Sequence, residues 1–195
     1  DQIRLLDTTG QEIVRVDHDG KNTHVVEASK LQNKADRYYF RDSIGLPAGR
    51  IYISPLDLNI ERGQIEIPYH PTLRLAMPLT DSQGKTRALL VLNYRADEMI
   101  GHVKDVTKQA ADHLMIVNED GYFLHAPNPD DEWGFMFGKA ELSLAQRFPA
   151  SWATIRATEQ GQFADAAGLW TVATAYPARS QQGKQQAAMP RTAQE

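Results

Sequence analysis

Short apolar runs separated by turn-forming residues open the chain. Ile3–Leu6 and Ile13–Val16 flank residues 7–11, where Asp and Gly favour a tight turn. This pattern predicts an antiparallel β-hairpin. A second polar turn follows, and residues 23–26 then fit a further short strand.

Helix-forming residues replace the alternating pattern after this hairpin. We predict a helix over Arg37–Ile44, with Asp36 as its N-cap and Gly45 at its C-terminal end. Residues 50–54 return to alternation and predict a short strand, whereas residues 55–71 lack a period and are expected to be irregular. The helix therefore lies between two strand-forming regions.

The most apolar part of the chain predicts a second hairpin. Leu73–Leu79 and Arg87–Tyr94 both read as strands, and the polar residues 81–85 between them form a turn. Ala96–Ala111 then carries apolar residues at helical spacing, so we expect a helix that connects this region to the rest of the chain.

The opening pattern recurs in the second half. Leu114–Val117 and Tyr122–His125 again flank a turn rich in Asn, Asp and Gly, which gives a weak internal repeat of roughly 110 residues. A helix around Leu142–Thr158, interrupted by Pro149, and a final strand around Leu169–Tyr176 complete this unit. The second unit is smaller and more irregular than the first.

Strands joined by short antiparallel connections, with helices between them, indicate the α+β class with a central antiparallel sheet in each of two tandem units. We expect a first module over 1–98, a connecting helix over 99–112 and a smaller module over 113–177. The polar segment 178–195 has no period and is expected to be a linker or a disordered tail.

Composition narrows the range of functions. The 195 residues include 21 Lys and Arg against 25 Asp and Glu, a net charge of −4 that does not favour a general nucleic-acid-binding surface. The absence of Cys excludes disulfides and thiolate chemistry. The longest apolar run, residues 88–92, is far shorter than the roughly 20 residues of a membrane-spanning helix. The chain also begins directly with a strand pattern, so we expect a fragment of a longer protein.

Motifs for catalysis and metal binding are missing. There is no Gly-x-Ser-x-Gly motif, and the six His residues lack the spacing of a zinc site. The acidic pairs lie in turn-like segments, and Asp17–Gly20 does not match a calcium-binding loop. We therefore predict no catalytic residue, no metal and no cofactor.

One cluster of aromatic and polar residues predicts a small-anion pocket. Its guanidinium groups can hold a carboxylate with paired charge-assisted hydrogen bonds, while the aromatic rings exclude water. The candidate residues are Arg37, Tyr39, Phe40, Tyr52, Ser54, Arg74 and Asn93. The alternative is that Arg37 lies at the surface or pairs with Asp36, and that the neighbouring aromatic residues simply belong to the core.

Several segments of the chain resemble the double-Cache (PDC) sensor domains of bacterial transmembrane receptors. The resemblance covers most of residues 1–177. The segments are LQNKADRYYF (31–40), GRIYISPLDLN (49–59), PTLRLAMPL (71–79), LLVLNY (89–94), VNEDGYFL (117–124) and PDDEWGFMF (129–137).

This resemblance implies two tandem PAS-like modules in the periplasm, the first of which binds a small molecule. A long N-terminal helix, absent from this chain, would lead from the first transmembrane segment. The resemblance further implies a homodimer in the full-length receptor, contact with the membrane only through flanking transmembrane helices, and a histidine kinase or diguanylate cyclase as the output domain. Catalysis would belong to that output domain, so this chain is expected to be a non-catalytic input domain that binds no nucleic acid.

The resemblance also gives roles to individual residues. In amino-acid-binding members an Arg-x-Trp-Tyr stretch holds the ligand carboxylate, and here Arg37, Tyr39 and Phe40 match it, with Tyr52 on the next strand. An Asp that binds the ligand amino group corresponds to Asn93. Because an amide cannot neutralise an ammonium group, an organic acid without an amine suits the site better than an amino acid.

A protein-interaction or dimerisation module without a small-molecule ligand is the alternative function. It draws on the large apolar residues Trp133, Phe135, Met136 and Phe137, which either form a contact patch or fill the core of the second module. An enzyme is the third possibility, with no motif to support it.

Overall fold

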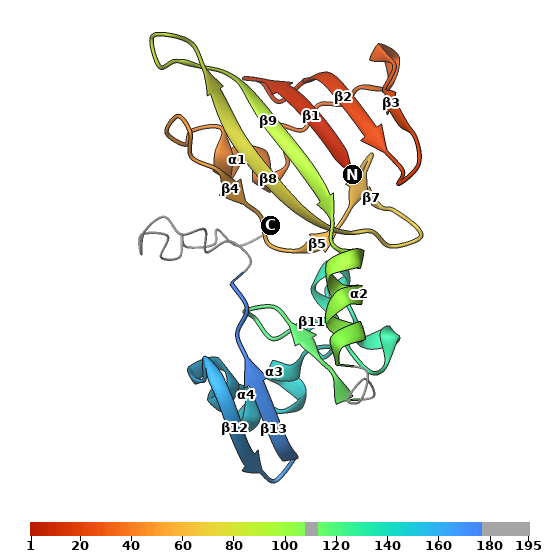
Figure 1. Cartoon of the computed structure of the whole chain (residues 1–195), viewed down its shortest axis with the longest axis vertical. Coiled ribbons are helices and arrows are strands. Elements are labelled where there is room, and N and C mark those ends of the chain that lie inside the picture. Colours follow the sequence, from red (N-terminus) through yellow and green to blue (C-terminus); the bar gives the residue numbers. More distant parts are fainter. Residues whose placement is uncertain (108–112, 177–195) are drawn as a thin grey trace.

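The computed structural model describes residues 1–107 and 113–176, and its largest feature is an antiparallel sheet in the N-terminal half (Figure 1). The sheet order is β3-β2-β1-β9-β8-β4, and β5 also pairs with β8, next to β4 on the same edge. The strands are β1 (Gln2–Asp7), β2 (Glu12–His18), β3 (Thr23–Val25), β4 (Tyr52–Ile53), β5 (Asp57–Leu58), β8 (Pro71–Thr80) and β9 (Thr86–Arg95). Both predicted hairpins are confirmed.

The turn between β1 and β2 depends on a glycine. Gly10 has a φ of +84°, and a Cβ atom there would lie 2.6 Å from the backbone nitrogen of Ala35. The Asp7 carboxylate accepts hydrogen bonds from the N–H groups of Thr9 at 2.7 Å and Gln11 at 3.0 Å. The turn is therefore fixed both by its own hydrogen bonds and by the segment packed against it.

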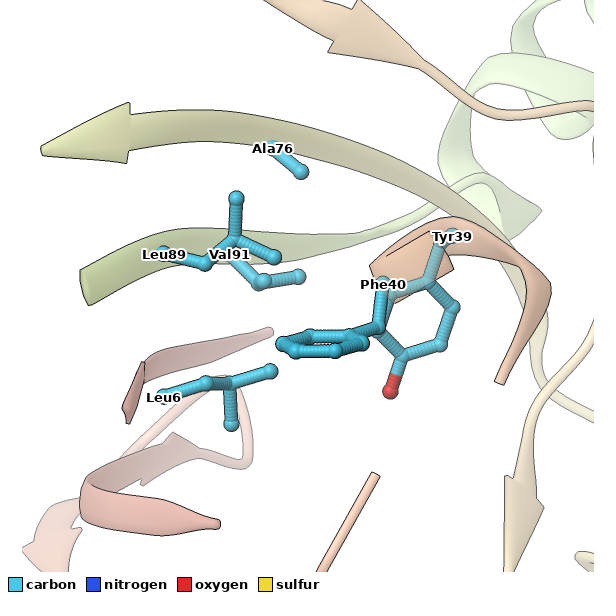
Figure 2. Packing of buried hydrophobic residues seen from close by; sticks show 6 residues of the cluster. All are labelled: Leu6, Tyr39, Phe40, Ala76, Leu89 and Val91. Carbon is cyan, nitrogen blue, oxygen red and sulfur yellow. The ribbon is translucent and has the colours of Figure 1, made fainter. Parts of the chain in front are cut away.

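Helix α1 (Tyr38–Ser43) covers one face of the sheet, which we call the inner face. Tyr39 and Phe40 are buried there, and Figure 2 shows the Phe40 ring among Leu6, Leu89 and Val91. The predicted helix is confirmed. Its N-cap is Arg37, which makes no side-chain capping bond, so the assignment of Asp36 as N-cap was wrong.

The segment 55–71, which we expected to be irregular, contains regular pairing. Besides β5 it forms a small hairpin of β6 (Ile60–Glu61) and β7 (Gln64–Ile65). Arg62 and Gly63 both have positive φ, at 52° and 77°, as a two-residue hairpin turn requires. We refer to residues 60–65 as the β6–β7 hairpin.

Helix α2 (Asp97–Val106) leads from the sheet to the C-terminal part of the chain (Figure 1). That part forms two separate two-stranded antiparallel sheets, β10-β11 and β12-β13, packed with short helices. Its elements are β10 (Ile116–Val117), β11 (Phe123–His125), η3 (Pro129–Asp131), η4 (Gly134–Phe137), α3 (Leu144–Arg147), α4 (Pro149–Ala157), β12 (Gln160–Asp165) and β13 (Gly168–Ala173).

The C-terminal elements differ from the prediction in two respects: this part has two separate two-stranded sheets rather than one central sheet, and one strand was missed. The helix predicted over 142–158 is confirmed as two helices, because α3 ends just before Pro149 and α4 begins there. The final strand is confirmed as β13, but its partner β12 was missed, since its largely polar sequence QGQFAD lacks the apolar run of a strand. The predicted tail and the end of the connecting helix lie outside the described residues.

The mixed α+β class with a central antiparallel sheet is confirmed. In the described part of the chain, no helix is long and apolar enough to span a membrane.

Candidate functional site

The register of the sheet gathers polar side chains at one end of its inner face. Residues directly opposite one another on paired strands point to the same face. Gln2 pairs with both Asp17 and Asn93, and Asn93 pairs with Arg74, which makes one polar row across β2, β1, β9 and β8. Two positions further along β1, Arg4 is the cross-strand partner of Arg15 on β2. Two positions further again, Leu6 of β1 pairs with Leu89 of β9, and both residues belong to the apolar core.

Arg74 lies at the centre of the first group of contacts, with 1% of its surface exposed. Its guanidinium donates hydrogen bonds to the carboxylate of Asp57 and, at 3.2 Å, to Oδ1 of Asn59. Its Cζ atom lies 5.2 Å from the centre of the Tyr39 ring. Burial acts to lower the pKa of Arg74, but the Asp57 carboxylate outweighs it and raises that pKa, so the residue stays charged.

Tyr38 completes this group. Its hydroxyl donates a hydrogen bond to Oδ2 of Asp57 at 2.7 Å. Burial, together with the Asp57 charge, raises the pKa of Tyr38. Tyr38 is therefore a hydrogen-bond donor that stays protonated and holds Asp57 toward Arg74.

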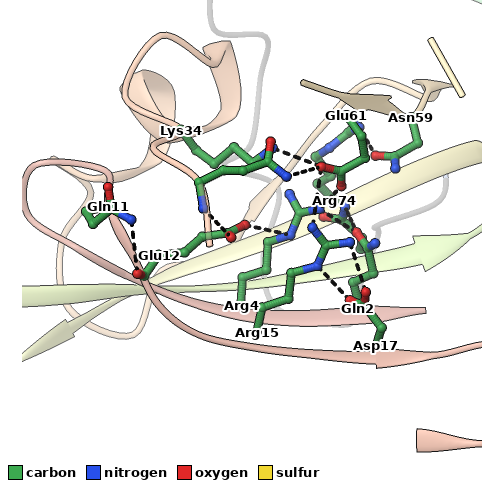
Figure 3. Close-up of polar contacts among 12 residues, drawn as sticks. Gln2, Arg4, Gln11, Glu12, Arg15, Asp17, Lys34, Asn59, Glu61 and Arg74 are labelled. Atoms are coloured by element: carbon green, nitrogen blue, oxygen red, sulfur yellow. Dashed lines mark hydrogen bonds and ion pairs between the residues drawn. The ribbon is translucent and has the colours of Figure 1, made fainter. Parts of the chain in front are cut away.

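Arg4 and Glu61 form the second group (Figure 3). Arg4, also 1% exposed, pairs with Glu61 and lies 3.3 Å from Glu12. The Glu61 carboxylate also lies 3.2 Å from Lys34 and 3.4 Å from Arg15. Burial acts to raise the pKa of Glu61, but these three cations outweigh it and lower the pKa to about 2. Glu61 is thus a carboxylate held by three cations.

The two groups lie side by side on the inner face. Gln2 lies between them, because its Oε1 accepts hydrogen bonds from Arg4 and from Asn93, the cross-strand partner of Arg74. Four cations face four carboxylates, so the charges balance. This ion-pair network consists of Arg4, Arg15, Lys34, Arg74, Glu12, Asp17, Asp57 and Glu61.

Two buried polar atoms in the first row lack a hydrogen-bond partner among the described residues. They are Nε of Arg74 and Oδ1 of Asn93, and both residues are at least 97% buried. Unpaired buried polar atoms cost about 1–3 kcal/mol each, so a hydrogen-bonding partner for these two atoms would be favourable. One atom donates and the other accepts, and the two residues are direct cross-strand partners.

The structure brings four of the predicted site residues together. Arg74 and Asn93 face each other, and the Tyr39 ring lies against Arg74. The Ser54 hydroxyl accepts the backbone N–H of Arg74 at 2.9 Å and thereby fixes this part of β8. Phe40 lies in the apolar core beside them.

Arg37 and Tyr52 lie at the margin of this group. Arg37 is half-buried, and its Cζ atom is 6.0 Å from the centre of the Tyr39 ring. Tyr52 donates a hydrogen bond to Asp42 at 3.1 Å, and burial together with this carboxylate raises the pKa of Tyr52. The contact of either residue with a ligand stays a prediction.

Sequence reasoning did not find Arg4, Glu12, Lys34 or Glu61. For Arg4 there was a signal, because it lies two positions before Leu6 and so shares its buried face. For Glu61 there was none, since its partners lie up to 57 positions away in the sequence.

A pocket of about 470 Å³ lies beside the ion-pair network. Its lining comes from β2 and β3, from residues 26–32, from the β6–β7 hairpin and from Glu66, and it includes Arg15, Lys30 and Glu61. None of the predicted site residues lines it. Glu61 therefore belongs both to the pocket wall and to the network behind it.

Known proteins resemble this chain in sequence and in architecture. A family model described as bacterial histidine kinase, sensor domain, matches residues 1–176. No curated protein matches. The domain of a protein assigned to the sensory box/GGDEF family of Vibrio parahaemolyticus is 24% identical with a TM-score of 0.73, over 85% of this chain and 62% of that one.

Two further solved structures share the fold. The extracellular domain of vpHK1S-Z8, described as a histidine kinase, is 23% identical with a TM-score of 0.70, over 85% of this chain and 59% of that one. The periplasmic sensory domain of the Campylobacter jejuni chemoreceptor Tlp1 is 12% identical with a TM-score of 0.55, over 84% and 60%. This chain thus spans about three fifths of the length of these structures.

Proposed function

The chain belongs to the family of bacterial histidine kinase sensor domains, and on that premise we propose that it senses a small organic anion on the inner face of its large sheet. As the sensor domain of a membrane receptor it acts outside the cytoplasm and is an input module. The catalytic output, a histidine kinase or a diguanylate cyclase, then belongs to another part of the full-length protein. The sensing module corresponds to residues 1–98, and 113–177 form the second module.

The pair Arg74 and Asn93 is the observation that carries this proposal. A carboxylate oxygen accepts from the buried Nε of Arg74, and a hydroxyl or protonated oxygen of the same ligand donates to Oδ1 of Asn93. Tyr39 supplies an aromatic wall, and Ser54 holds Arg74 in place. Arg37, Phe40 and Tyr52 complete the proposed site at its margin.

The amide of Asn93 also favours organic acids over amino acids. A buried ammonium group requires a compensating carboxylate. The nearby carboxylate of Asp57 is already engaged by Arg74 and Tyr38. Ligands with carboxylate and hydroxyl groups therefore fit better than those with an amine.

Ligand-induced thermal stabilisation tests this function. A panel of organic acids, among them succinate, malate and citrate, is compared with amino acids. At a concentration of about 100 Kd, a ligand of the native state adds about 2.7 kcal/mol, which corresponds to a rise in Tm of roughly 5–10 °C for a chain of this size. Asn93→Asp places a negative charge in the site and should abolish the shift given by organic acids.

Gln83→Glu is the matched control. It adds the same charge in the exposed turn at the far end of β8 and β9, so it should leave the shift intact. An organic-acid shift that is the same in Asn93→Asp as in the wild type would remove this site from the proposal. Arg37→Ala tests separately whether Arg37 contacts the ligand. If organic acids raise the Tm of this variant as much as that of the wild type, Arg37 lies outside the site.

The alternative, a protein-interaction or dimerisation module, has one specific observation in its favour. Phe137 is 42% exposed and contacts the half-exposed ring of Tyr69 at 5.8 Å between ring centres. Trp133, in contrast, is 3% exposed and packs inside a core cluster. Light scattering over a concentration series tests this alternative: a homodimer through this patch should weaken in Phe137→Ser, and an unchanged assembly state would count against it.

A further inference from the structure

The segment Leu56–Glu61 has two chemically different sides. Along an extended chain, successive side chains point in opposite directions. The odd positions are Asp57, Asn59 and Glu61, all polar, whereas the even positions 56, 58 and 60 are Leu, Leu and Ile. We refer to residues 56–61 as the two-sided segment.

The polar side holds the ion-pair network. Asp57 and Asn59 both accept hydrogen bonds from Arg74, and Glu61 pairs with Arg4, Arg15 and Lys34. The segment thus supplies two of the four carboxylates that balance the buried cations. If either carboxylate moves away, the buried cations that it pairs with lose their partner and can bind an anion from solution.

The apolar side belongs to another cluster. Leu58 is fully buried and packs in one core cluster with Leu124 of β11 and Trp133, which precedes η4. Leu56 and Ile100 of α2 pack against the same cluster. In Figure 1, β5 lies where the large sheet meets α2 and the C-terminal part. One short segment therefore contacts both parts of the molecule.

The pocket beside the network gives an anion access to the end of this segment. Glu61 and Arg15 both line it, so a carboxylate that enters the pocket reaches Arg15, one of the three cations that Glu61 now holds. The ligand and the Glu61 side chain carry the same chemical group, and both cannot occupy the same cations at full strength. Glu61 is in this respect an internal competitor.

We infer that an organic anion displaces the Glu61 carboxylate from Arg4, Arg15 and Lys34, and that the two-sided segment transmits this displacement to the cluster of Leu58, Leu124 and Trp133. This rests on the proposed sensing of an organic anion, and it adds the pocket beside the network as a second place, apart from Arg74 and Asn93, where such an anion binds. The signal then passes from the large sheet to the C-terminal part through residues 56–61, in addition to the covalent path through α2. No new contact is required, only the release of one carboxylate.

Glu61→Gln tests the competition. The amide keeps the size of the side chain but removes its charge, so succinate should bind about tenfold more tightly, as measured by isothermal titration calorimetry. Glu66→Gln is the matched control, because Glu66 lines the same pocket but bonds Asn59 at 2.7 Å rather than the cations. Unchanged or weaker succinate binding in Glu61→Gln, with the Glu66→Gln protein equal to the wild type, would overturn the competition.

Hydrogen exchange without any ligand tests the transmission. The backbone N–H of Trp133 donates to the carbonyl of Phe123 at 2.8 Å, and this amide reports on the cluster below the segment. Exchange at Trp133 should be at least about threefold faster in Glu61→Gln than in the wild type or in Glu66→Gln. Faster exchange confined to residues 57–66, with Trp133 unchanged, would refute the transmission.

The two readouts separate the proposals. If no organic acid binds the wild type or Glu61→Gln, the proposed function and the competition both fail. The exchange at Trp133 still decides whether the segment couples the two parts. If organic acids bind and the Trp133 exchange does not respond, the sensing proposal stands and the transmission is refuted.

Discussion

Replacement of Glu61 by Gln should destabilise the protein at neutral pH and have little effect in strong acid. The pKa of Glu61 falls from its usual 4.5 to about 2 in the folded protein, chiefly because Arg4, Lys34 and Arg15 outweigh the cost of burial. At about 1.4 kcal/mol for each pH unit between the two values, the charged form contributes ~3 kcal/mol to folding at pH 7.

The sign of the pH dependence follows from the depressed pKa. Because the folded value lies below the unfolded one, this stabilisation is fully present above about pH 4.5 and is lost as the pH falls toward 2. The Glu61→Gln protein lacks this component at every pH. Its deficit relative to the wild type should therefore shrink between pH 4.5 and 2.

Urea unfolding at pH 7, 5, 4 and 3 measures the deficit directly. The side chain of Glu61 is 13% exposed, so solvent weakens these pairs only slightly. Glu66→Gln, made directly after the same hairpin, is the control and should not reproduce the pH-dependent deficit. A Glu61→Gln deficit of the same size at pH 7 and pH 3 would refute the assignment of this stability to the ion pairs.

Three further substitutions test other parts of the structure, each by chemical or thermal unfolding. Leu58→Ala leaves a cavity under a fully buried side chain and should cost about 2–5 kcal/mol; a smaller loss would mean that the cluster with Trp133 is loosely packed. Gly10→Ala should cost about 1–3 kcal/mol and more than Gly84→Ala, because both glycines have positive φ but only at Gly10 does a Cβ meet the backbone of Ala35; equal losses would contradict that close approach. Asp57→Asn leaves Arg74 without its charged partner and should cost about 3–5 kcal/mol, whereas Asp81→Asn in the exposed pair with Arg87 should cost under about 1 kcal/mol; comparable losses would argue against the burial of Arg74.

Local patterns in the sequence were sufficient for most of the large sheet. The alternation of Leu73–Leu79 and the apolar run Ala88–Leu92 predict two long strands, and the polar turn between them fixes their antiparallel pairing. Asp and Gly between Leu6 and Glu12 likewise predict the first turn. These features depend on neighbouring residues alone.

Short elements and long-range contacts could not be predicted in the same way. β6 and β7 contain two residues each, too few to establish a period, and only the Arg62–Gly63 turn joins them. The β12 strand is mostly polar, because it lies at an exposed edge. Short or polar strands such as these form because of the residues that they pack against, and those tertiary contacts cannot be read from the local sequence.

The candidate site was predicted in part for the same reason. Arg74 and Asn93 were found because each interrupts an apolar strand at a position that the register brings to the inner face. The carboxylate partner of Arg74 comes from the segment 55–71, where no pattern indicated a strand. Arg74 was therefore visible in the sequence, whereas Asp57, which balances its charge, was not, and neither were Arg4, Lys34 and Glu61 of the second group.

The balance of buried charge in the network has a consequence for how such a domain tolerates its surroundings. Dissolved salt screens exposed pairs such as Arg87 and Asp81, but it barely reaches the enclosed pairs Arg74–Asp57 and Arg4–Glu12. A change in the ionic strength outside the cell should therefore leave these two pairs almost unaffected. The domain can then respond to the chemical identity of a solute while disregarding the salinity in which that solute arrives.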